Sequence, residues 1–262
     1  MLTHRQRQVL TQLQSRHGRR KSGLFVAEGL RACAEALARQ PQWLDAMVCT
    51  ASFAASAAGG ELVTRLQATA AGAALIQTDD LEFAALAATE NPQGVLCVLR
   101  RPDTRVPAQL TDPFVLVLDR IREPGNLGTI LRTAWAVGLG SVWLTEGTAD
   151  PFEAKAVRAG MGAHFSRRVV QAGTLTAVRD QLAERGRQPL YLTVPRAGLS
   201  CFDPAFSLAQ AALVIGNEAD GITDLGLGPH VTIPMPGAAE SLNAAQAATV
   251  LLLDAVRRGL LS

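Results

Sequence analysis

Cysteine and histidine are scarce in this 262-residue chain, which holds four of each. The cysteines form no C-x-x-C pair, and the histidines are isolated from one another. Metal sites in proteins need these ligands at short spacings, so the sequence predicts no bound metal. Because no disulfide framework is visible either, we expect a reducing, cytoplasmic location. Cys97 lies inside the apolar run of residues 95–99 and is predicted to be a small buried hydrophobic side chain.

Long apolar runs are also missing. No stretch reaches the roughly 18 consecutive apolar residues of a membrane span, so we expect no membrane partner. The opening MLTHRQRQVL has no apolar core of the kind found in secretory leaders. Aromatic residues make up only 5% of the chain, whereas 48% is hydrophobic and 18% charged. This composition excludes a disordered chain and predicts cores of alanine, valine and leucine.

Acidic residues are absent from the first 21 positions, although the whole chain has a net charge of only +2. The basic residues of this opening segment are Arg5, Arg7, Arg16, Arg19, Arg20 and Lys21. A local basic arm is typical of a segment that binds a polyanion. The alternative is a helix face whose charges are simply solvated.

Strand-like and helical segments alternate on both sides of a stretch rich in proline and arginine, residues 100–113. This stretch has no hydrophobic periodicity, and we interpret residues 103–113 as a linker. The alternative, a long loop within one domain, is uncommon. Residues 1–102 predict a small α/β domain that opens with one helix at residues 3–17. Residues 114–262 predict a mostly parallel sheet with helices on both faces.

The first of three motifs follows an apolar strand at residues 114–118. It contains Asn126, Gly128 and Arg132 in a helix expected at residues 126–137. Asn126 is a good N-cap, and Gly128 allows close backbone approach. Arg132 lies about one and a half turns further on, where its guanidinium could clamp a phosphate. The alternative is an ordinary cap and a surface arginine.

The second motif, Gly216-Asn217-Glu218, follows an apolar strand expected at residues 211–215. Gly216 permits a ligand to lie against the backbone, and Glu218 adds a carboxylate at the carboxyl end of the strand. That end of a parallel sheet is where α/β proteins bind their ligands. The alternative is a plain turn, because Asn, Glu, Asp and Gly all favour turns.

The third motif is IPMPGAAESLNAAQAA at residues 233–248. Two prolines and a glycine within residues 234–237 exclude both a helix and a strand ladder. The backbone N–H and C=O groups of this loop are therefore free to hold a ligand, with Glu240, Ser241 and Asn243 at its exit. The alternative is a strand–turn–helix connection in which Ser241 caps the helix.

Taken together, the three motifs resemble the signatures of one family. N-x-G-x-x-x-R, G-N-E-x-x-G-I and I-P-M-x-x-x-x-x-S-L-N are typical of the SpoU (TrmH-type) branch of the SPOUT methyltransferases. The resemblance covers residues 114–262 and includes the segment Asp150–His164 between the first two motifs. FVAEG at residues 25–29 is similar to the substrate-binding domain that many members carry.

The resemblance implies transfer of a methyl group from S-adenosylmethionine to a ribose 2′-hydroxyl of RNA. It also implies a C-terminal domain with a trefoil-knotted chain and a homodimer formed through that domain. The first domain would bind the RNA, with Arg16, Arg19, Arg20 and Lys21 on phosphates. Glu28 is acidic, and we expect a cap or a structural hydrogen bond from it rather than a phosphate contact.

The family's functional residues have counterparts at matching positions. Cofactor contacts, largely through the main chain, are implied for Thr193, Gly216, Asn217, Ile233, Met235 and Leu242. Catalytic roles are implied for Arg132, Asn126, Glu218, Ser241 and Asn243. Because a guanidinium does not give up its proton near neutral pH, we interpret Arg132 as a phosphate ligand that orients the 2′-hydroxyl. The proton of that hydroxyl would pass to phosphate, to water or to Glu218.

Several functions stay open at this point. The N-terminal extension favours ribosomal RNA of the large subunit (23S) over transfer RNA, which remains the alternative substrate. A non-catalytic RNA-binding or ribosome-assembly factor is a second class, disfavoured because all three motifs are intact. A nucleotide-binding oxidoreductase is disfavoured because no glycine fingerprint follows the first strand.

Overall fold

The computed structural model describes residues 2–69 and 72–261. The chain forms two compact units. The first contains the residues up to Asp103 together with Asp150–Ser166, and the second contains Thr104–Ala149 and the residues from Arg167 onward. The units therefore do not follow a single cut in the sequence, because a segment from the middle of the chain packs with the N-terminal part.

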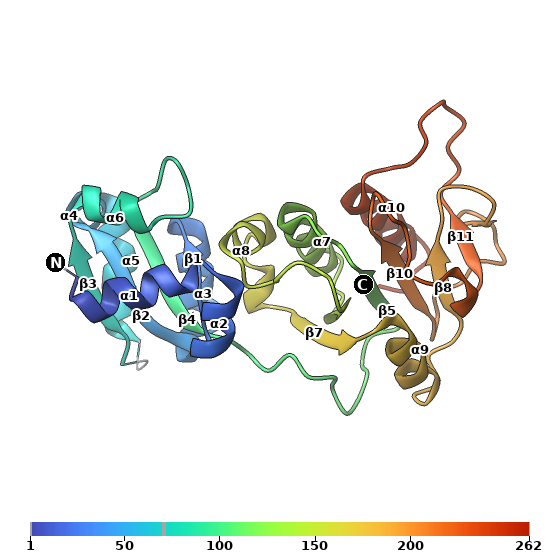
Figure 1. The fold of residues 1–262 in the computed structure, drawn as a ribbon, viewed down its shortest axis with the longest axis horizontal. Coiled ribbons are helices and arrows are strands. Elements are labelled where there is room, and N and C mark those ends of the chain that lie inside the picture. Colours follow the sequence, from blue (N-terminus) through green and yellow to red (C-terminus); the bar gives the residue numbers. More distant parts are fainter. Residues whose placement is uncertain (1, 70–71, 262) are drawn as a thin grey trace. The chain divides into compact units, whose positions relative to one another are not determined.

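The first unit is a four-stranded mixed sheet with helices on both faces (Figure 1). Its strand order is β1-β4-β2-β3; β4 is antiparallel to both neighbours, and β2 and β3 are parallel. The elements are α1 (His4–Leu13), α2 (Arg16–Ser22), β1 (Leu24–Glu28), α3 (Leu30–Arg39), η1 (Pro41–Trp43), β2 (Leu44–Thr50), α4 (Ala51–Ala55), α5 (Ala57–Ala68), β3 (Ala74–Thr78), α6 (Asp80–Leu86), β4 (Val95–Arg100), α8 (Ala154–Gly160) and η2 (Ala163–Phe165).

Side-chain caps explain where the first helices begin and end. Thr3 and Gln6 form a capping box at the start of α1, and Ser15 accepts a hydrogen bond from Gly18 to begin α2. Gly23 ends α2 in the left-handed conformation, with φ 69°. The single helix expected at residues 3–17 is therefore wrong, since two helices meet at Ser15.

The core of the first unit lies on both faces of its sheet because strand residues alternate between faces. Phe25, Met47 and Cys97 point to one face, where Phe152 and Phe165 of the inserted segment join the same cluster. Val48, Leu96 and Val98 pack on the other face, against α1 and α6. All four cysteines of the chain are buried and free, as predicted for Cys97. Burial raises the pKa of the Cys33 and Cys49 thiols, which makes them poor nucleophiles.

The second unit is a seven-stranded sheet in the order β7-β6-β5-β10-β8-β11-β9. Every paired strand runs parallel to its neighbour, which confirms the predicted parallel sheet. Its elements are β5 (Val115–Asp119), α7 (Pro124–Ala136), β6 (Ser141–Thr145), β7 (Arg168–Gly173), α9 (Leu175–Ala183), β8 (Leu190–Thr193), β9 (Leu199–Ser200), β10 (Ala212–Gly216), η3 (Leu225–Leu227), β11 (His230–Thr232) and α10 (Ala244–Arg257).

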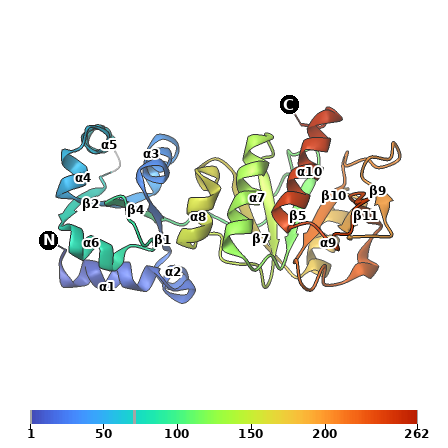
Figure 2. The same cartoon turned by 90° about the horizontal axis from the view of Figure 1, so that it is seen from above.

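Helices cover both faces of this sheet. Val117, Trp143 and Val214 face α9 in one buried cluster. The alternate strand residues face the opposite side, where α7 and α10 lie next to each other (Figures 1 and 2). A near-continuous apolar run in each strand is what burial on both faces requires.

The strand order places the ends of separate motifs side by side. β10 lies between β5 and β8, with Gly216 in register with Asp119. β11 lies between β8 and β9, with Val231 in register with Thr193. Because the strands are parallel, the loops that follow them leave from the same edge of the sheet.

Candidate functional site

A cavity of about 370 Å³ lies at the carboxyl ends of β8, β10 and β11 in the second unit. Its walls come from the loops after these strands and from the start of α10. All six residues with an implied cofactor role line it, namely Thr193, Gly216, Asn217, Ile233, Met235 and Leu242. Glu218 and Ser241 line it as well, so two of the three motifs share one cavity.

The loop after β10 closes tightly on itself. Asn217 and Gly221 exchange two backbone hydrogen bonds of 3.1 and 3.0 Å, and the Asn217 Oδ1 accepts from the backbone of Ala219 at 2.9 Å. A Cβ atom at Gly216 would lie 2.7 Å from the Gly221 carbonyl carbon and from Ile222 Cγ1. Only glycine fits there, so this turn also forms a wall of the cavity.

Asp119 anchors the far end of that loop, and the sequence reasoning missed it. Its side chain is buried and accepts from the Thr223 backbone N–H at 2.7 Å and the Thr223 hydroxyl at 2.6 Å. Its other oxygen accepts from the Thr145 hydroxyl at 2.7 Å. The sequence did offer one signal, an aspartate directly after an apolar strand. A carboxylate at such a position is expected to be buried, and a buried carboxylate needs hydrogen-bond partners.

Asn126 does not cap α7, which corrects the sequence prediction. The helix begins at Pro124, a residue favoured in the first turn, and Glu123 is the N-cap. The Asn126 side chain instead joins the other two motifs. Its Nδ2 donates to Glu218 Oε1, and its Oδ1 accepts from Asn243 Nδ2 at 3.2 Å.

The orientation of these amides follows from α10. Asn243 Oδ1 accepts from the backbone N–H groups of Ala245 at 2.9 Å and Gln246 at 3.3 Å. Its Nδ2 must therefore face outward and donate to Asn126, whose own Nδ2 then donates to Glu218. The three motifs thus form one hydrogen-bonded chain from a helix terminus to a carboxylate.

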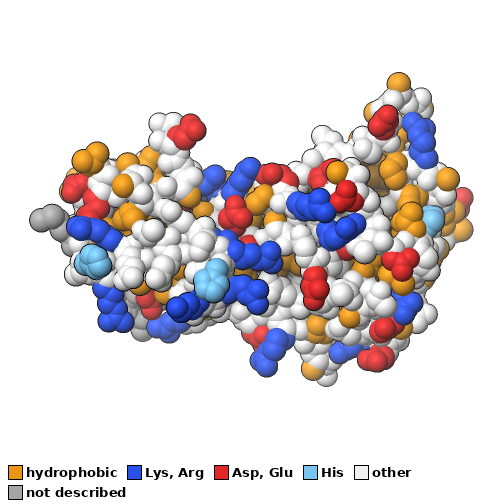
Figure 3. Space-filling view, in the orientation of Figure 1, with side chains coloured by type: hydrophobic (Ala, Val, Ile, Leu, Met, Phe, Trp, Pro, Cys, Tyr) orange, Lys and Arg blue, Asp and Glu red, His pale blue; other side chains and the backbone are white. Residues whose placement is uncertain are grey.

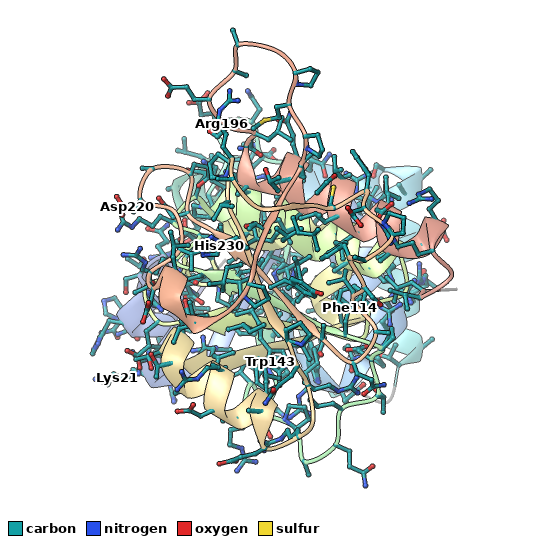
Figure 4. All side chains as sticks on the ribbon, turned by 90° about the vertical axis from the view of Figure 1, so that its right-hand side faces the viewer. Lys21, Phe114, Trp143, Arg196, Asp220 and His230 are labelled. Atoms are coloured by element: carbon teal, nitrogen blue, oxygen red, sulfur yellow. The ribbon has the colours of Figure 1, made fainter. Side chains whose placement is uncertain are left out.

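Ser241 is not the N-cap of the last helix, because Asn243 fills that position. The serine lies two residues earlier, on the loop that lines the cavity. This loop projects from the unit between β11 and α10 (Figure 1). Arg196, from the loop after β8, donates to the Ala239 carbonyl at 3.1 Å and ties the two loops together (Figure 4).

Two arginines, one in the first motif and one in the loop before it, lie at the surface. Arg132 is exposed on α7, beyond Asn126, and does not line the cavity. Arg122 makes an ion pair of 2.6 Å with Asp220, and both side chains are exposed. Exposed ion pairs are weak, so an incoming phosphate could replace Asp220 as the partner of Arg122 at little cost.

The basic arm divides into exposed and buried residues. Arg16, Arg20 and Lys21 are exposed on α2, and Figure 3 shows basic side chains gathered over α1 and α2. Arg19 is only 3% exposed. Its Nε is 2.7 Å from Asp150 Oδ2, and its Nη1 donates to the Leu13 and Gln14 carbonyls at 2.9 and 3.1 Å. Arg19 is therefore a structural residue, and its expected phosphate contact is corrected.

The inserted segment completes the first unit around this ion pair. His164 is buried, and burial lowers its pKa from 6.5 to about 4, so its imidazole is neutral near pH 7. Arg101 lies over the Phe152 ring, 4.8 Å from its centroid. Glu28 accepts from the Ala88 backbone at 2.7 Å and from the Thr89 hydroxyl, which confirms the expected structural hydrogen bond.

Within residues 2–69 and 72–261, no group of three or more histidine, cysteine, aspartate or glutamate side chains is arranged to hold a metal ion. No helix in the described part of the chain has the length and apolarity needed to cross a membrane.

These features define a class of protein. The model of the SpoU rRNA methylase family matches residues 113–253, more than half of the chain, and the chain belongs to that family. A second model, of the MRM3-like substrate binding domain, matches residues 7–97.

Individual relatives match over most of the chain. The 23S rRNA (guanosine(2553)-2′-O)-methyltransferase RlmP of Bacillus subtilis is 38% identical over 180 residues, which cover 65% of this chain and 67% of the relative. An uncharacterised tRNA/rRNA methyltransferase of Synechocystis is 32% identical over 252 residues, 95% of this chain and 89% of the relative. The chain spans about half (53%) of mouse mitochondrial rRNA methyltransferase 3, at 30% identity over 222 residues and 64% of this chain.

Solved structures give the same result for the fold. The SpoU methyltransferase AviRb of Streptomyces viridochromogenes, in complex with AdoMet, matches with a TM-score of 0.82 and 29% identity over 98% of this chain and 99% of that one. An AdoMet-bound rRNA methyltransferase of Sinorhizobium meliloti matches with a TM-score of 0.81 and 30% identity, over 100% of this chain and 97% of that one. The seven-stranded unit has the SPOUT methyltransferase fold.

Proposed function

We propose that this chain is an S-adenosylmethionine-dependent RNA 2′-O-ribose methyltransferase that acts on 23S rRNA of the large ribosomal subunit. One observation carries the proposal: Asn126 joins Glu218 and Asn243, so residues from three distant motifs converge beside one cavity. Relatives named for 23S rRNA favour that substrate over transfer RNA.

The cavity suits S-adenosylmethionine in size and in chemistry. Its volume of about 370 Å³ falls within the range of roughly 300–1,000 Å³ typical of ligand pockets. Ile215, Ile233 and Leu242 offer apolar walls for an adenine ring, beside backbone groups of the proline-rich loop. Glu218 and Asp220 put negative charge near a ligand that carries a sulfonium and an ammonium group.

The cofactor supplies an activated methyl group, so the side chains mainly position the ribose and handle one proton. Arg132 binds the phosphate next to the target ribose and orients the 2′-hydroxyl, as its fixed fork allows. Asn126 holds Glu218 through one oxygen, which leaves the rest of the carboxylate to accept a hydrogen bond or the proton from that hydroxyl. Ser241 completes the pocket wall. Asn243 acts from beside the cavity, where it fixes the Asn126 amide.

The first unit, with Arg16, Arg20 and Lys21, holds the RNA by phosphate contacts, and the protein works in the cytoplasm as a homodimer. Exposed Leu253 and Val256 on α10 support a dimer through the second unit, because they leave an apolar strip on its surface. The insertion of β10 and β11 between earlier strands supports the knotted chain path.

Transfer of labelled methyl groups to total rRNA and to total tRNA tests this function. We expect incorporation into 23S rRNA, at a ribose that becomes resistant to alkaline cleavage. Incorporation into tRNA alone would show that tRNA, not 23S rRNA, is the substrate. Cofactor binding without methyl transfer to either RNA would favour the non-catalytic alternative. An isothermal titration with S-adenosylmethionine, run in parallel, separates loss of catalysis from loss of cofactor binding.

A further inference from the structure

A second cavity, of about 410 Å³, lies in the first unit and has no part in cofactor binding. It forms where α8 of the inserted segment packs against β1, between that helix and α1 and α6. We propose that this cavity holds one unpaired nucleotide of the RNA substrate, with guanine as the preferred base. The inference rests on the proposed RNA methyltransferase function.

One side of the cavity is apolar. Leu13, Val26, Leu86 and Leu96 come from four different elements and line it together. Val26 and Leu86 are only partly buried, so their faces can contact a ligand. Bases that leave an RNA stack are commonly held between apolar or aromatic side chains, and this wall can do the same.

The other side carries one cation without a hydrogen-bond partner. Arg158, on α8, lines the cavity, and its Nη1 is buried with no partner among the described residues. Arg19 also lines the cavity, but its charge is matched by Asp150 at 2.7 Å. A buried guanidinium nitrogen without a partner favours an anionic group, and a phosphate fits its fork.

The carboxylate of Glu28 adds selectivity. Each of its oxygens accepts one hydrogen bond, from Ala88 and Thr89, and each keeps a second lone pair. A carboxylate only accepts, so a ligand group that faces Glu28 must present hydrogen-bond donors, N–H or O–H. Two neighbouring donors on one edge, the ring N–H and the adjacent amino group, occur in guanine alone among the four RNA bases.

An apolar body, donor groups and an anion together describe a nucleotide, and the surroundings extend the match to RNA. Arg16 and Arg20 are exposed on α2, the short helix whose Arg19 lines the cavity, and could bind neighbouring phosphates. Glu153 also lines the cavity and opposes an anion, so we assign the phosphate to Arg158 rather than to the cavity as a whole.

NMR of the full-length protein, labelled at leucine and valine methyl groups, tests this directly. A hexaribonucleotide with one central guanine should shift the methyl signals of Val26, Leu86 and Leu96, and the same hexamer with adenine should shift them less. Leu182 on α9 of the second unit should not respond. Unchanged signals at Val26 and Leu86, or equal shifts with both hexamers, would overturn the proposal.

Two pairs of variants add an affinity readout. Ala88→Phe places a ring in the cavity without a charge change and should weaken hexamer binding roughly tenfold or more. Ala85→Phe, at an exposed position of α6 outside the cavity, should leave binding unchanged. Arg158→Gln should weaken binding and lower the slope of log affinity against log salt by about 0.7. Arg65→Gln, exposed on α5, is its control.

The failures of the two proposals are distinguishable. Thermal denaturation and S-adenosylmethionine titration show whether each variant is folded. Suppose that the wild-type protein methylates 23S rRNA but Ala88→Phe does not affect hexamer binding. The nucleotide site would then be rejected, and the proposed methyltransferase function would stand. No transfer to any RNA would instead reject the proposed function.

Discussion

The two units build their binding surfaces from different parts of the chain. The cavity of the second unit is shaped by backbone, at strand ends and in a loop broken by two prolines, and its side chains mainly lock that backbone in place. The first unit offers side-chain charge from α2 and α8 on an ordinary scaffold. A binding site built from backbone groups can be recognised in the sequence by its glycines and prolines. A binding site built from charged side chains is recognised only by arginines, which could equally be structural.

The largest expected effect concerns catalysis in the second unit. Arg132→Ala should lower methyl transfer by about 10³-fold or more while S-adenosylmethionine affinity stays within a few fold, because Arg132 lies outside the cavity. Arg132→Lys should fail too, since lysine cannot copy the planar fork. Arg179→Ala, at a partly exposed position of α9 outside the cavity, is the control. Weak cofactor binding in Arg132→Ala would contradict the separation of roles.

The buried ion pair of the first unit should give the next largest effect, on stability. Arg19→Ala leaves Asp150 buried without its partner and should cost about 3–5 kcal/mol of unfolding free energy. Arg20→Ala, next to it but exposed, should change stability by less than about 0.5 kcal/mol and should weaken RNA binding. Chemical denaturation and RNA titration of the two variants test this contrast. Equal losses of stability in the two variants would contradict it.

His164 should make the first unit sensitive to acid. Its folded pKa of about 4 lies below its ordinary value of 6.5, so the unfolded chain binds the proton more readily. The contribution of neutral His164 to the free energy of unfolding is therefore complete above pH 6.5. It falls by up to about 3 kcal/mol as the pH drops toward 4. His164→Gln cannot titrate and should lack this loss, so the stability gap between the two proteins must vary across that window. A gap independent of pH would refute the assignment.

Two glycines near the cofactor cavity differ in the space around them, and replacing each by alanine compares a packed site with an open one. Gly216→Ala forces a Cβ atom to 2.7 Å from neighbouring atoms, at a cost of about 1–3 kcal/mol, and should weaken S-adenosylmethionine binding. Gly237→Ala, in the projecting loop, meets nothing within 4 Å and should bind normally. Isothermal titration compares them, and equal affinities would show that the backbone around Gly216 does not shape the cofactor site.

The smallest effect distinguishes the two residues that could have capped α10. Asn243→Ala removes the observed cap and should cost about 1 kcal/mol, as well as disturbing Asn126. Ser241→Ala should leave stability unchanged and weaken cofactor binding slightly. Thermal denaturation that showed the larger loss for Ser241→Ala would reverse the assignment.

Much of the second unit could be predicted from the sequence. Buried parallel strands read as apolar runs, and the motifs follow those strands directly. The caps were harder: Asn126 and Ser241 are both good caps, and only the structure shows Glu123 and Asn243 in those positions. Asp119 was missed because its partner, Thr223, is distant in the sequence.

The first unit was less predictable for a physical reason. Nothing in a run of basic residues distinguishes Arg19 from Arg20, because the difference depends on Asp150, a residue more than a hundred positions away. The inserted segment carried a second surprise, since it lies between two motifs of the methylase but packs with the N-terminal unit. A charge pattern in the sequence predicts a binding surface only when it is known which charged side chains the fold buries.

The division of labour between the units has one direct test, the salt dependence of two affinities measured on the same full-length protein. If the first unit binds RNA through phosphates, the affinity for 23S rRNA must fall steeply and linearly on logarithmic axes as salt rises. The affinity for S-adenosylmethionine, held by apolar walls and backbone, must change far less. An rRNA affinity independent of salt, or a cofactor affinity that falls as steeply, would contradict the account.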